Sequence, residues 1–287
     1  MNSDILSTIQ NGMSGYSKGQ KLIARYILDS YDKAAFMTAS KLGKTVNVSE
    51  STVVRFAVEL GYDGYPNMQK ALQEMIRNKL TSVQRIEVAN DRLGNQDILS
   101  TVLHSDVEKI RMTLEETDRA AFNKAVETIL KAKHIYILGV RSSYTIACFL
   151  GFYFNLMFDN VTMVNTSSMS EMFEQIVRVG KDDVVIGISF PRYSSRTVKA
   201  LRFCHDSGAE VVTLTDSKQS PIAAYADEVL VAKSDMMSLV DSLVAPLSIC
   251  NALLVAIGRE REVELATTFT ELERIWDEYD VYEKAEI

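Results

Sequence analysis

Two short segments of the chain gather hydroxyl and guanidinium groups where each would open a helix. The first carries Gly139, Arg141, Ser142 and Ser143, and the second carries Ser189, Arg192, Ser194, Ser195, Arg196 and Thr197. Free N–H groups and the dipole at a helix start attract anions, and arginine forks fit phosphate oxygens. The two segments together predict a phosphate-binding site. Taken singly, each is also consistent with an ordinary helix cap and a solvated charge.

The residues that would turn this site into an enzyme are sparse. Isomerisation of a sugar needs a general base, usually a glutamate or a histidine poised over the substrate. The chain has three histidines, His104, His134 and His205, and two of them are expected in a strand and a helix, where a structural role is favoured. Glu171 and Glu174 follow a polar loop and could approach the site. No dinucleotide or nucleotide phosphate loop and no metal-spaced cluster occurs, so we predict no catalytic residue, metal or cofactor.

A third group of candidate residues lies in segment 37–66, which is typical of two helices joined by a tight turn. Gly43 provides the small residue where the helices cross, and Asn47 tolerates the left-handed conformation that the turn needs. Ser49 can cap the second helix, and Gly61 can end it. The core face of that helix would carry Val53, Phe56, Ala57 and Leu60.

The outward residues of this segment are those that could contact DNA. Ser51 and Thr52 fall in the first turn of the second helix, and Arg55 lies one turn further on. Lys41 and Lys44 on the preceding helix, and Lys70 beyond, could reach backbone phosphates. A plain helical hairpin in a three-helix bundle would show the same spacing.

Segment 48–72, VSESTVVRFAVELGYDGYPNMQKAL, resembles the N-terminal domain of RpiR-type transcription regulators. The positions that match that pattern are Val48, Ser49, Thr52, Val53, Arg55, Phe56, Leu60, Gly61, Tyr62, Gly64 and Tyr65. Gly43 and Asn47 depart from it, because the family more often has alanine and glycine there. The resemblance implies a helix-turn-helix that binds double-stranded DNA, with Lys41, Lys44, Ser49, Ser51, Thr52 and Arg55 as candidate contacts.

Residues 120–260 resemble the sugar isomerase (SIS) domain that RpiR-type regulators carry. Segments 182–201 and 211–230 carry this resemblance, together with the loop at 139–143. It implies a phosphorylated sugar or amino-sugar effector, held through Ser142, Ser143, Ser189, Ser194, Ser195 and Thr197. The bulky stretch 190–193 departs from the small residues usual there and could fill the phosphate pocket. A phosphosugar isomerase and a SIS domain that only oligomerises are the alternatives.

The elements that must position these residues differ between the two parts of the chain. Residues 1–80 show helical spacing throughout, and segment 81–97 is polar and predicts a linker. Beyond it, short apolar runs alternate with helical segments, which predicts an α/β domain at 98–260 with a five-stranded parallel sheet. The expected strands are 134–138, 161–164, 183–188, 210–215 and 228–232. A buried helix is expected at 144–158, a long apolar helix at 237–258 and an amphipathic helix within 261–287.

Charge and cysteine content support this division. Residues 1–80 hold 10 Lys/Arg and 7 Asp/Glu and the remainder holds 21 and 31, so the net charge of −7 divides into +3 and −10. A basic head on an acidic body is compatible with DNA binding by the head. Cys148, Cys204 and Cys250 lack metal or disulfide spacing, and we expect all three to be buried in a reducing cytoplasm. No apolar run reaches the roughly 20 residues of a membrane span, and we expect a homodimer or tetramer.

Overall fold

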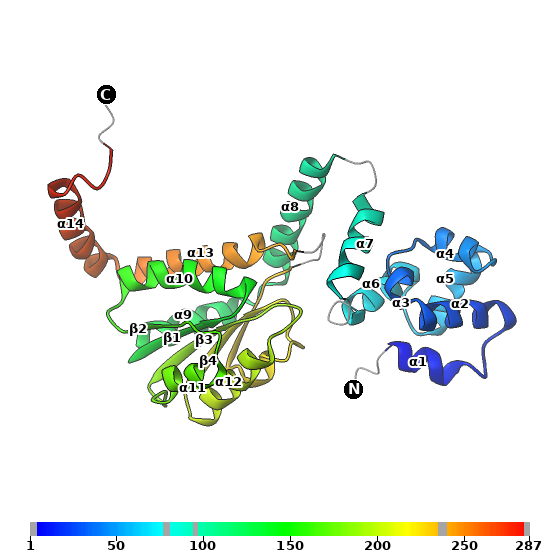
Figure 1. Cartoon of the computed structure of the whole chain (residues 1–287), viewed down its shortest axis with the longest axis horizontal. Helices are drawn as coiled ribbons and strands as arrows, with labels where there is room; N and C mark the ends of the chain where they lie inside the picture. Colours follow the sequence, from blue (N-terminus) through cyan, green and yellow to red (C-terminus); the bar gives the residue numbers. More distant parts are fainter. Residues whose placement is uncertain (1–4, 77–80, 94–96, 235–239, 284–287) are drawn as a thin grey trace. The chain divides into compact units, whose positions relative to one another are not determined.

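The computed structural model describes residues 5–76, 81–93, 97–234 and 240–283. The chain divides into two compact units, each described by itself (Figure 1). The head unit comprises Met1–Val102 with Met236–Asp241, and the body unit comprises Leu103–Asp235 with Ser242–Ile287. The segment expected to be a linker contains a helix, α7 (Ser82–Leu93), and the division falls within α8 (Ile98–Glu116).

The head unit is helical in its described residues, as its sequence predicts. Its first six helices are α1 (Ile5–Gly12), α2 (Lys18–Asp29), α3 (Tyr31–Ala34), α4 (Ala39–Thr45), α5 (Glu50–Glu59) and α6 (Tyr65–Ile76). Ser17 caps α2 in a reciprocal capping box with Gln20, as expected of a serine before a helical run. Ile9, Ile23 and Phe56 come from three of these helices and are fully buried in one core.

Helix α6 ties down the carbonyl groups that follow α3. Tyr65 Oη donates a hydrogen bond of 2.7 Å to the Met37 carbonyl, and Gln69 Nε2 donates one of 2.8 Å to the same oxygen. Gln73 Nε2 reaches the Ala35 carbonyl at 2.8 Å. Burial raises the pKa of Tyr65 to about 12, so its hydroxyl stays protonated and able to donate. These contacts fix the chain that leads into α4.

The body unit is built around the predicted five-stranded parallel sheet. Its strands are β1 (His134–Gly139), β2 (Val161–Val164), β3 (Asp183–Ile188), β4 (Glu210–Thr215) and β5 (Glu228–Val231). They lie in the order β2-β1-β3-β4-β5, and every neighbouring pair is parallel. All five expected strands are therefore confirmed, with their ends within one residue of the expected ones.

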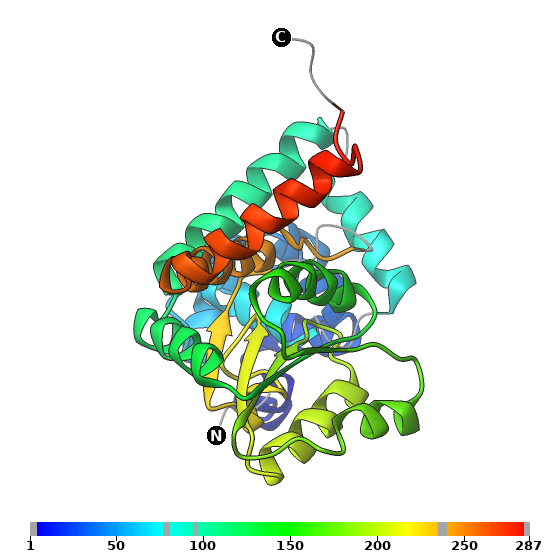
Figure 2. The same cartoon turned by 90° about the vertical axis from the view of Figure 1, so that its left-hand side faces the viewer.

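Helices cover both faces of the sheet, as Figures 1 and 2 show. On one face α9 (Arg119–Lys131), α10 (Ser142–Met157) and α13 (Val244–Glu260) enclose a core with Ile137, Leu150 and Ile186. On the other face α11 (Met169–Ile176), α12 (Ser195–Asp206) and the short helix η1 (Ala223–Tyr225) enclose a second core. Glycine allows close packing here, because a Cβ on Gly187 would lie 2.4 Å from Leu201 Cδ1.

Two expectations for the long apolar helices are wrong in part. Helix α13 begins at Val244 rather than at residue 237, and residues 235–239 lie outside the described ones. Pro246 explains the later start, because proline is tolerated only in the first turn of a helix. The expected burial of Cys148 is also wrong, since α10 lies in the outer layer and turns Cys148 toward solvent. Along the described residues, no helix has the length and apolar character that a bilayer crossing needs.

Candidate functional site

The turn between α4 and α5 has the geometry that the sequence predicts. Asn47 adopts a φ of 58°, in the left-handed region that asparagine tolerates. The Val48 N–H donates to the Gly43 carbonyl at 2.8 Å, which closes the turn. A Cβ on Gly43 would lie 2.9 Å from the Val48 carbonyl oxygen, so glycine lets the two helices meet this closely.

Helix α5 is capped and anchored as expected. The Ser49 side chain accepts a hydrogen bond of 3.2 Å from the Thr52 N–H. Val53, Phe56 and Ala57 are fully buried in the head core. Leu60 is the C-cap and only partly buried, although the 3.6-residue period places it on the core face.

The opposite side of α5 is exposed and polar at its start. Ser51 and Arg55 are exposed, and Arg55 Nε donates to the Ser51 carbonyl at 3.3 Å along the helix. Thr52 is half-buried beside Gly19, so its hydroxyl is less open than that of Ser51. The Ser49 hydroxyl lies 2.9 Å from that of Ser51 and 2.8 Å from that of Thr52, which gathers three hydroxyls at the helix start.

The flanking residues of this surface were expected in part. Lys41 and Lys44 on α4 and Lys70 on α6 are exposed, as residues that reach phosphates must be. Val54 and Val58 are exposed apolar residues on the same helix as Arg55, and no role was predicted for them. Apolar side chains beside an arginine suit the methyl group of thymine in the major groove. The i, i+4 spacing of these two valines on a short helix is the sequence signal that could have identified them.

The two loops that the sequence predicts to bind an anion emerge side by side from the sheet. Strands β1 and β3 are neighbours, with Gly139 opposite Ile188 at their carboxyl ends. In the strand order β2-β1-β3-β4-β5 the chain proceeds from β1 to β2 on one side and continues with β3 on the other. Ligands of doubly wound sheets bind at this point of reversal. The structure therefore brings the two predicted segments to one place.

The first loop is short and places its arginine in an unusual backbone conformation. Arg141 has a φ of 57° and its side chain is exposed. Ser142 is exposed at the first position of α10, and Ser143 behind it is buried. A Cβ on Gly139 would lie 2.6 Å from the Ser143 carbonyl oxygen, so glycine lets α10 begin directly above β1.

The bulky residues of the second loop contact the core and the end of β4. Phe190 is buried in the core beneath α10 and α13, so its ring does not lie at the start of α12. Tyr193 Oη donates a hydrogen bond of 2.6 Å to Asp216 Oδ1 at the end of β4. Ser189 is buried, with its N–H bonded to the Leu214 carbonyl at 3.2 Å, and Arg192 is exposed. Asp216 was missed, although a polar residue directly after an expected strand could have indicated it.

The start of α12 holds a buried hydroxyl group next to the second loop. Ser194 is the N-cap residue, yet its side chain makes no capping bond to the described residues of the helix, and Ser195 is exposed. Thr197 is fully buried, and its Oγ1 finds no hydrogen-bond partner among the described residues. A buried hydroxyl without a partner is costly, which makes it a candidate for a ligand contact. Arg196 donates to the Ser167 carbonyl and joins this helix start to the loop after β2.

The candidate catalytic groups are engaged elsewhere or lie apart. His134 opens β1 at the amino end of the sheet, opposite to the loops, and its Nε2 lies 2.8 Å from Thr162 Oγ1. His205 lies in the last turn of α12 beside Tyr225, and His104 lies on α8. Glu171 reaches the carboxyl edge of the sheet, where it is hydrogen-bonded to Thr166 Oγ1.

Comparisons with known proteins match both units. The sequence profile of the helix-turn-helix domain of the rpiR family matches residues 3–79, and that of the SIS domain matches residues 128–256. A helix-turn-helix transcriptional regulator of Clostridium perfringens is 25% identical over 225 residues, which cover 78% of this chain and 79% of that protein. The transcriptional regulator HexR of Escherichia coli is 25% identical over 224 residues, which cover 78% of this chain and 75% of HexR. These relatives are named as regulators of transcription.

Two solved structures resemble the fold. NanR of Vibrio vulnificus, solved with ManNAc-6P, has a TM-score of 0.59 and 21% identity, and the match covers 96% of this chain and 98% of NanR. The sugar isomerase domain of an RpiR transcription factor from Sphaerobacter thermophilus has a TM-score of 0.59 and 30% identity. That match covers 62% of this chain and 99% of the other. The chain belongs to the RpiR-type transcription regulators, which join an rpiR-family helix-turn-helix domain to a SIS domain.

Proposed function

We propose that this regulator binds its operator through α5 and that a phosphorylated sugar or amino sugar, bound where β1 and β3 end, changes its affinity for DNA. The genes that it controls would belong to carbohydrate metabolism. The observation that carries the effector assignment is the buried Oγ1 of Thr197, at the start of α12 beside the point where the sheet reverses, which has no hydrogen-bond partner in the part of the chain that the structure describes. The DNA assignment depends on the exposed Ser51 and Arg55 of α5.

The geometry of α5 supports major-groove binding. The helix is anchored by Val53 and Phe56, while Arg55 projects from the opposite side. An arginine side chain that extends away from its helix can bind guanine O6 and N7 with two hydrogen bonds. Lys41 and Lys44 would add phosphate contacts, which raise affinity without adding sequence preference.

The chemistry of the loops supports a phosphate ester as the effector. Ser194, Ser195 and Thr197 bring three hydroxyls to one helix start, and Arg141 and Arg192 add exposed cations nearby in the two loops. The structural relative NanR was solved with ManNAc-6P, a sugar phosphate of this kind. We infer that this chain binds without turning its ligand over, because its histidines lie apart from the loops and Glu171 is hydrogen-bonded to Thr166.

Polar contacts give the effector site a route to the rest of the protein. Lys218, two residues after Asp216, forms an ion pair of 3.0 Å with Asp118 at the start of α9. Lys233, beyond β5, forms an ion pair of 2.5 Å with Glu116 at the end of α8. Loops at the ligand edge of the sheet are thus tied to the helix that follows the head. Coupling requires that the effector bind the DNA-competent and DNA-free states with different affinity. As a DNA-binding regulator the chain would act in the cytoplasm as a homo-oligomer.

The direct test measures binding of the full-length chain to double-stranded DNA from upstream of its own gene, at fixed salt. Arg55→Ala should weaken binding by roughly 10- to 100-fold, the cost of one lost base contact. Arg202→Ala, which removes an exposed arginine of α12, is the matched control and should change binding less than about 2-fold. Equal affinity of the Arg55→Ala variant and the unmodified chain would refute the DNA assignment.

The effector is tested on the same complex. Hexose 6-phosphates and N-acetylhexosamine 6-phosphates are added in turn, with inorganic phosphate and the unphosphorylated sugars as controls. One of the sugar phosphates should change DNA affinity at least 5-fold, as expected of an allosteric coupling. Consumption of that sugar phosphate would instead show an enzyme, and a flat response across the panel would refute the effector assignment.

A further inference from the structure

Helix α8 is amphipathic, but its apolar side is exposed and does not pack on its own domain. Its apolar stripe, Leu103, Val107, Ile110 and Leu114, is exposed, with Val107 and Leu114 each 61% exposed. Its described contacts with the body unit use polar residues on the other side. Thr113 Oγ1 accepts a hydrogen bond of 2.8 Å from the Lys233 N–H, and Asp106 Oδ1 accepts one of 2.6 Å from Ser242. An isolated domain places such a stripe against its core.

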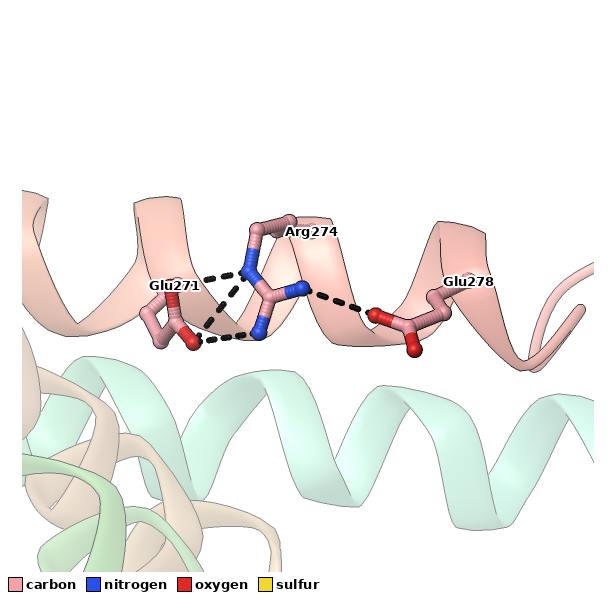
Figure 3. A network of polar contacts seen from close by, with 3 residues as sticks. All are labelled: Glu271, Arg274 and Glu278. Carbon is pink, nitrogen blue, oxygen red and sulfur yellow. Dashed lines mark hydrogen bonds and ion pairs between the residues drawn. The ribbon is translucent and has the colours of Figure 1, made fainter.

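Helix α14 (Glu262–Glu278) carries a second apolar stripe, in which Phe269 is exposed and the other members are half-buried. Its residues Leu265, Phe269, Leu272 and Trp276 repeat the 4-3-4 spacing of the stripe on α8. No residue of α14 is buried, and this spacing is the seam of paired helices. Glu271, Arg274 and Glu278 form a ladder of ion pairs along the helix (Figure 3). A helical period places this ladder on the side away from the stripe.

The layer between the two helices is apolar as well. In Figure 1, α8 and α14 rise from opposite ends of the layer that α10 and α13 form. Phe152 of α10 is 64% exposed, and Val255 of α13 is 73% exposed. The four helices expose nine large apolar side chains of the body unit, namely Leu103, Val107, Ile110, Leu114, Phe152, Tyr153, Val255, Val263 and Phe269.

The area of this surface fits a protein interface. At roughly 100 Å² each, eight of these side chains, without Val263 on the far side of α14, present on the order of 800 Å², beyond the 300–600 Å² of the largest patch on a typical monomer. A standard interface buries about 800 Å² per partner. Helix α8 holds four acidic and two basic side chains, and α14 holds six acidic and one basic. This acidity disfavours an anionic membrane or nucleic acid as the occupant.

We propose that a second copy of this chain covers this surface, with α8 of each copy packed along α14 of the other. The two stripes have the same length and spacing, and a two-fold axis would form the α8–α14 pair twice. The Glu-Arg-Glu ladder at 108, 111 and 115 would border the seam, and the one at 271, 274 and 278 would face away from it, each with most of its charge already paired. The proposal names the surface behind the self-association in the proposed function, and it depends on neither DNA nor effector.

The test compares two valines of equal exposure. Val107→Glu places a charge in the α8 stripe, whereas Val177→Glu places one directly after α11, at a residue that is 63% exposed but lies outside the surface. Sedimentation at 1–50 µM, without DNA or sugar, should show a dimer or tetramer for the unmodified chain and for Val177→Glu. Val107→Glu should raise the dissociation constant at least 100-fold. Phe269→Glu on α14 should raise the dissociation constant by a similar factor, and this variant provides the test if Val107→Glu does not fold.

A labelling measurement reports on the covered surface itself. Cys148 lies one helical turn before Phe152 on the exposed side of α10, whereas Cys204 and Cys250 are buried and burial raises the pKa of each thiol to about 12. Alkylation of Cys148 should be at least 5-fold faster in Val107→Glu than in Val177→Glu. The proposal would be overturned if the unmodified chain were monomeric at 50 µM. It would also be overturned if Val107→Glu had the same assembly mass and the same Cys148 alkylation rate as the unmodified chain. Loss of DNA binding by Arg55→Ala with the dimer intact would leave the proposed function standing on its own.

Discussion

At the scale of single residues, the proposed effector site depends on one hydroxyl. Thr197 is fully buried and its Oγ1 has no partner within the described ranges of the chain, and Thr213 in β4 shares both properties. Only Thr197 lies in the first turn of the helix that follows the second loop. The two threonines therefore share the free-energy cost of a buried, unpaired hydroxyl. They differ in whether a bound phosphate could supply the missing hydrogen-bond partner.

Thr197→Val tests this difference because valine keeps the shape and removes the hydroxyl. In the absence of ligand, the variant should be as stable as the unmodified chain or up to about 1 kcal/mol more stable, since the lost group had no partner. The same variant should weaken binding of the effector sugar phosphate by about 10-fold, measured by calorimetry. Thr213→Val is the matched control, with the same effect on stability and unchanged affinity. Equal affinity of both variants would remove Thr197 from the site.

At the scale of elements, caps and ion pairs hold the helices at the ligand edge. Asp118 accepts hydrogen bonds of 3.1 and 3.2 Å from the Ala120 and Ala121 N–H groups at the start of α9. It also pairs with Lys218 in the loop after β4. The bond from Ala121, followed by the contact with Lys218, holds the pKa of Asp118 below its ordinary value. One carboxylate thus joins the start of α9 to the loop that carries Asp216.

The pH dependence of stability should reveal this carboxylate. Because its folded pKa is lowered, Asp118 stabilises the folded state above its ordinary pKa, and this contribution is lost as the pH falls toward the folded value. Asp118→Asn keeps a capping oxygen without the charge, so its melting temperature should lie below that of the unmodified chain at pH 6. The gap should close as the pH falls below the ordinary aspartate pKa of about 4. A gap that stays constant over this range would assign the effect to packing.

The elements were predicted well where a local pattern determines them. Apolar runs such as Asp183–Ile188 identified all five strands, and Ser49 was recognised as a cap. Helix α7 was missed because its packing depends on residues far along the chain, as in the ion pair of 3.3 Å between Arg85 and Asp241. The start of α13 was readable in Pro246 and was overlooked.

The site was predicted in its members but not in its contacts. The two loops were placed together correctly, because parallel strands end at one edge. That Phe190 turns into the core and that Tyr193 bonds to Asp216 follow from three-dimensional packing, which no spacing encodes. The exposure of Cys148 could not be predicted either, since a helix that is apolar all round does not reveal which side faces its own sheet.

At the scale of the whole molecule, charge is divided between the parts that meet different partners. The first 80 residues carry +3 and the remainder carries −10, so an acidic protein would bind a polyanion through its basic head. Binding of this kind releases counterions in proportion to the number of phosphate contacts. The dependence of affinity on salt therefore counts the lysines that touch the backbone of DNA.

Lys41→Ala and Lys44→Ala should each lower the slope of log K against log salt by about one, measured between 50 and 200 mM. Their effect on affinity should be similar for operator and unrelated DNA, because phosphate contacts carry no sequence. Lys199→Ala removes an exposed lysine of α12 and should leave the slope unchanged. An unchanged slope in both head variants would place the phosphate contacts on other residues.

The glycines beneath the two ligand loops have a consequence for how this family can diverge. Gly139 and Gly187 let α10 and α12 settle directly on their strands, so main-chain amides reach the edge of the sheet whatever side chains follow. An anchor made of backbone cannot be exchanged by substitution, whereas Arg141, Arg192 and the Tyr193–Asp216 pair can. We therefore expect new sugar preferences to arise by substitution at the rim of the proposed pocket, while the proposed phosphate contacts of the backbone amides and of Thr197 are kept.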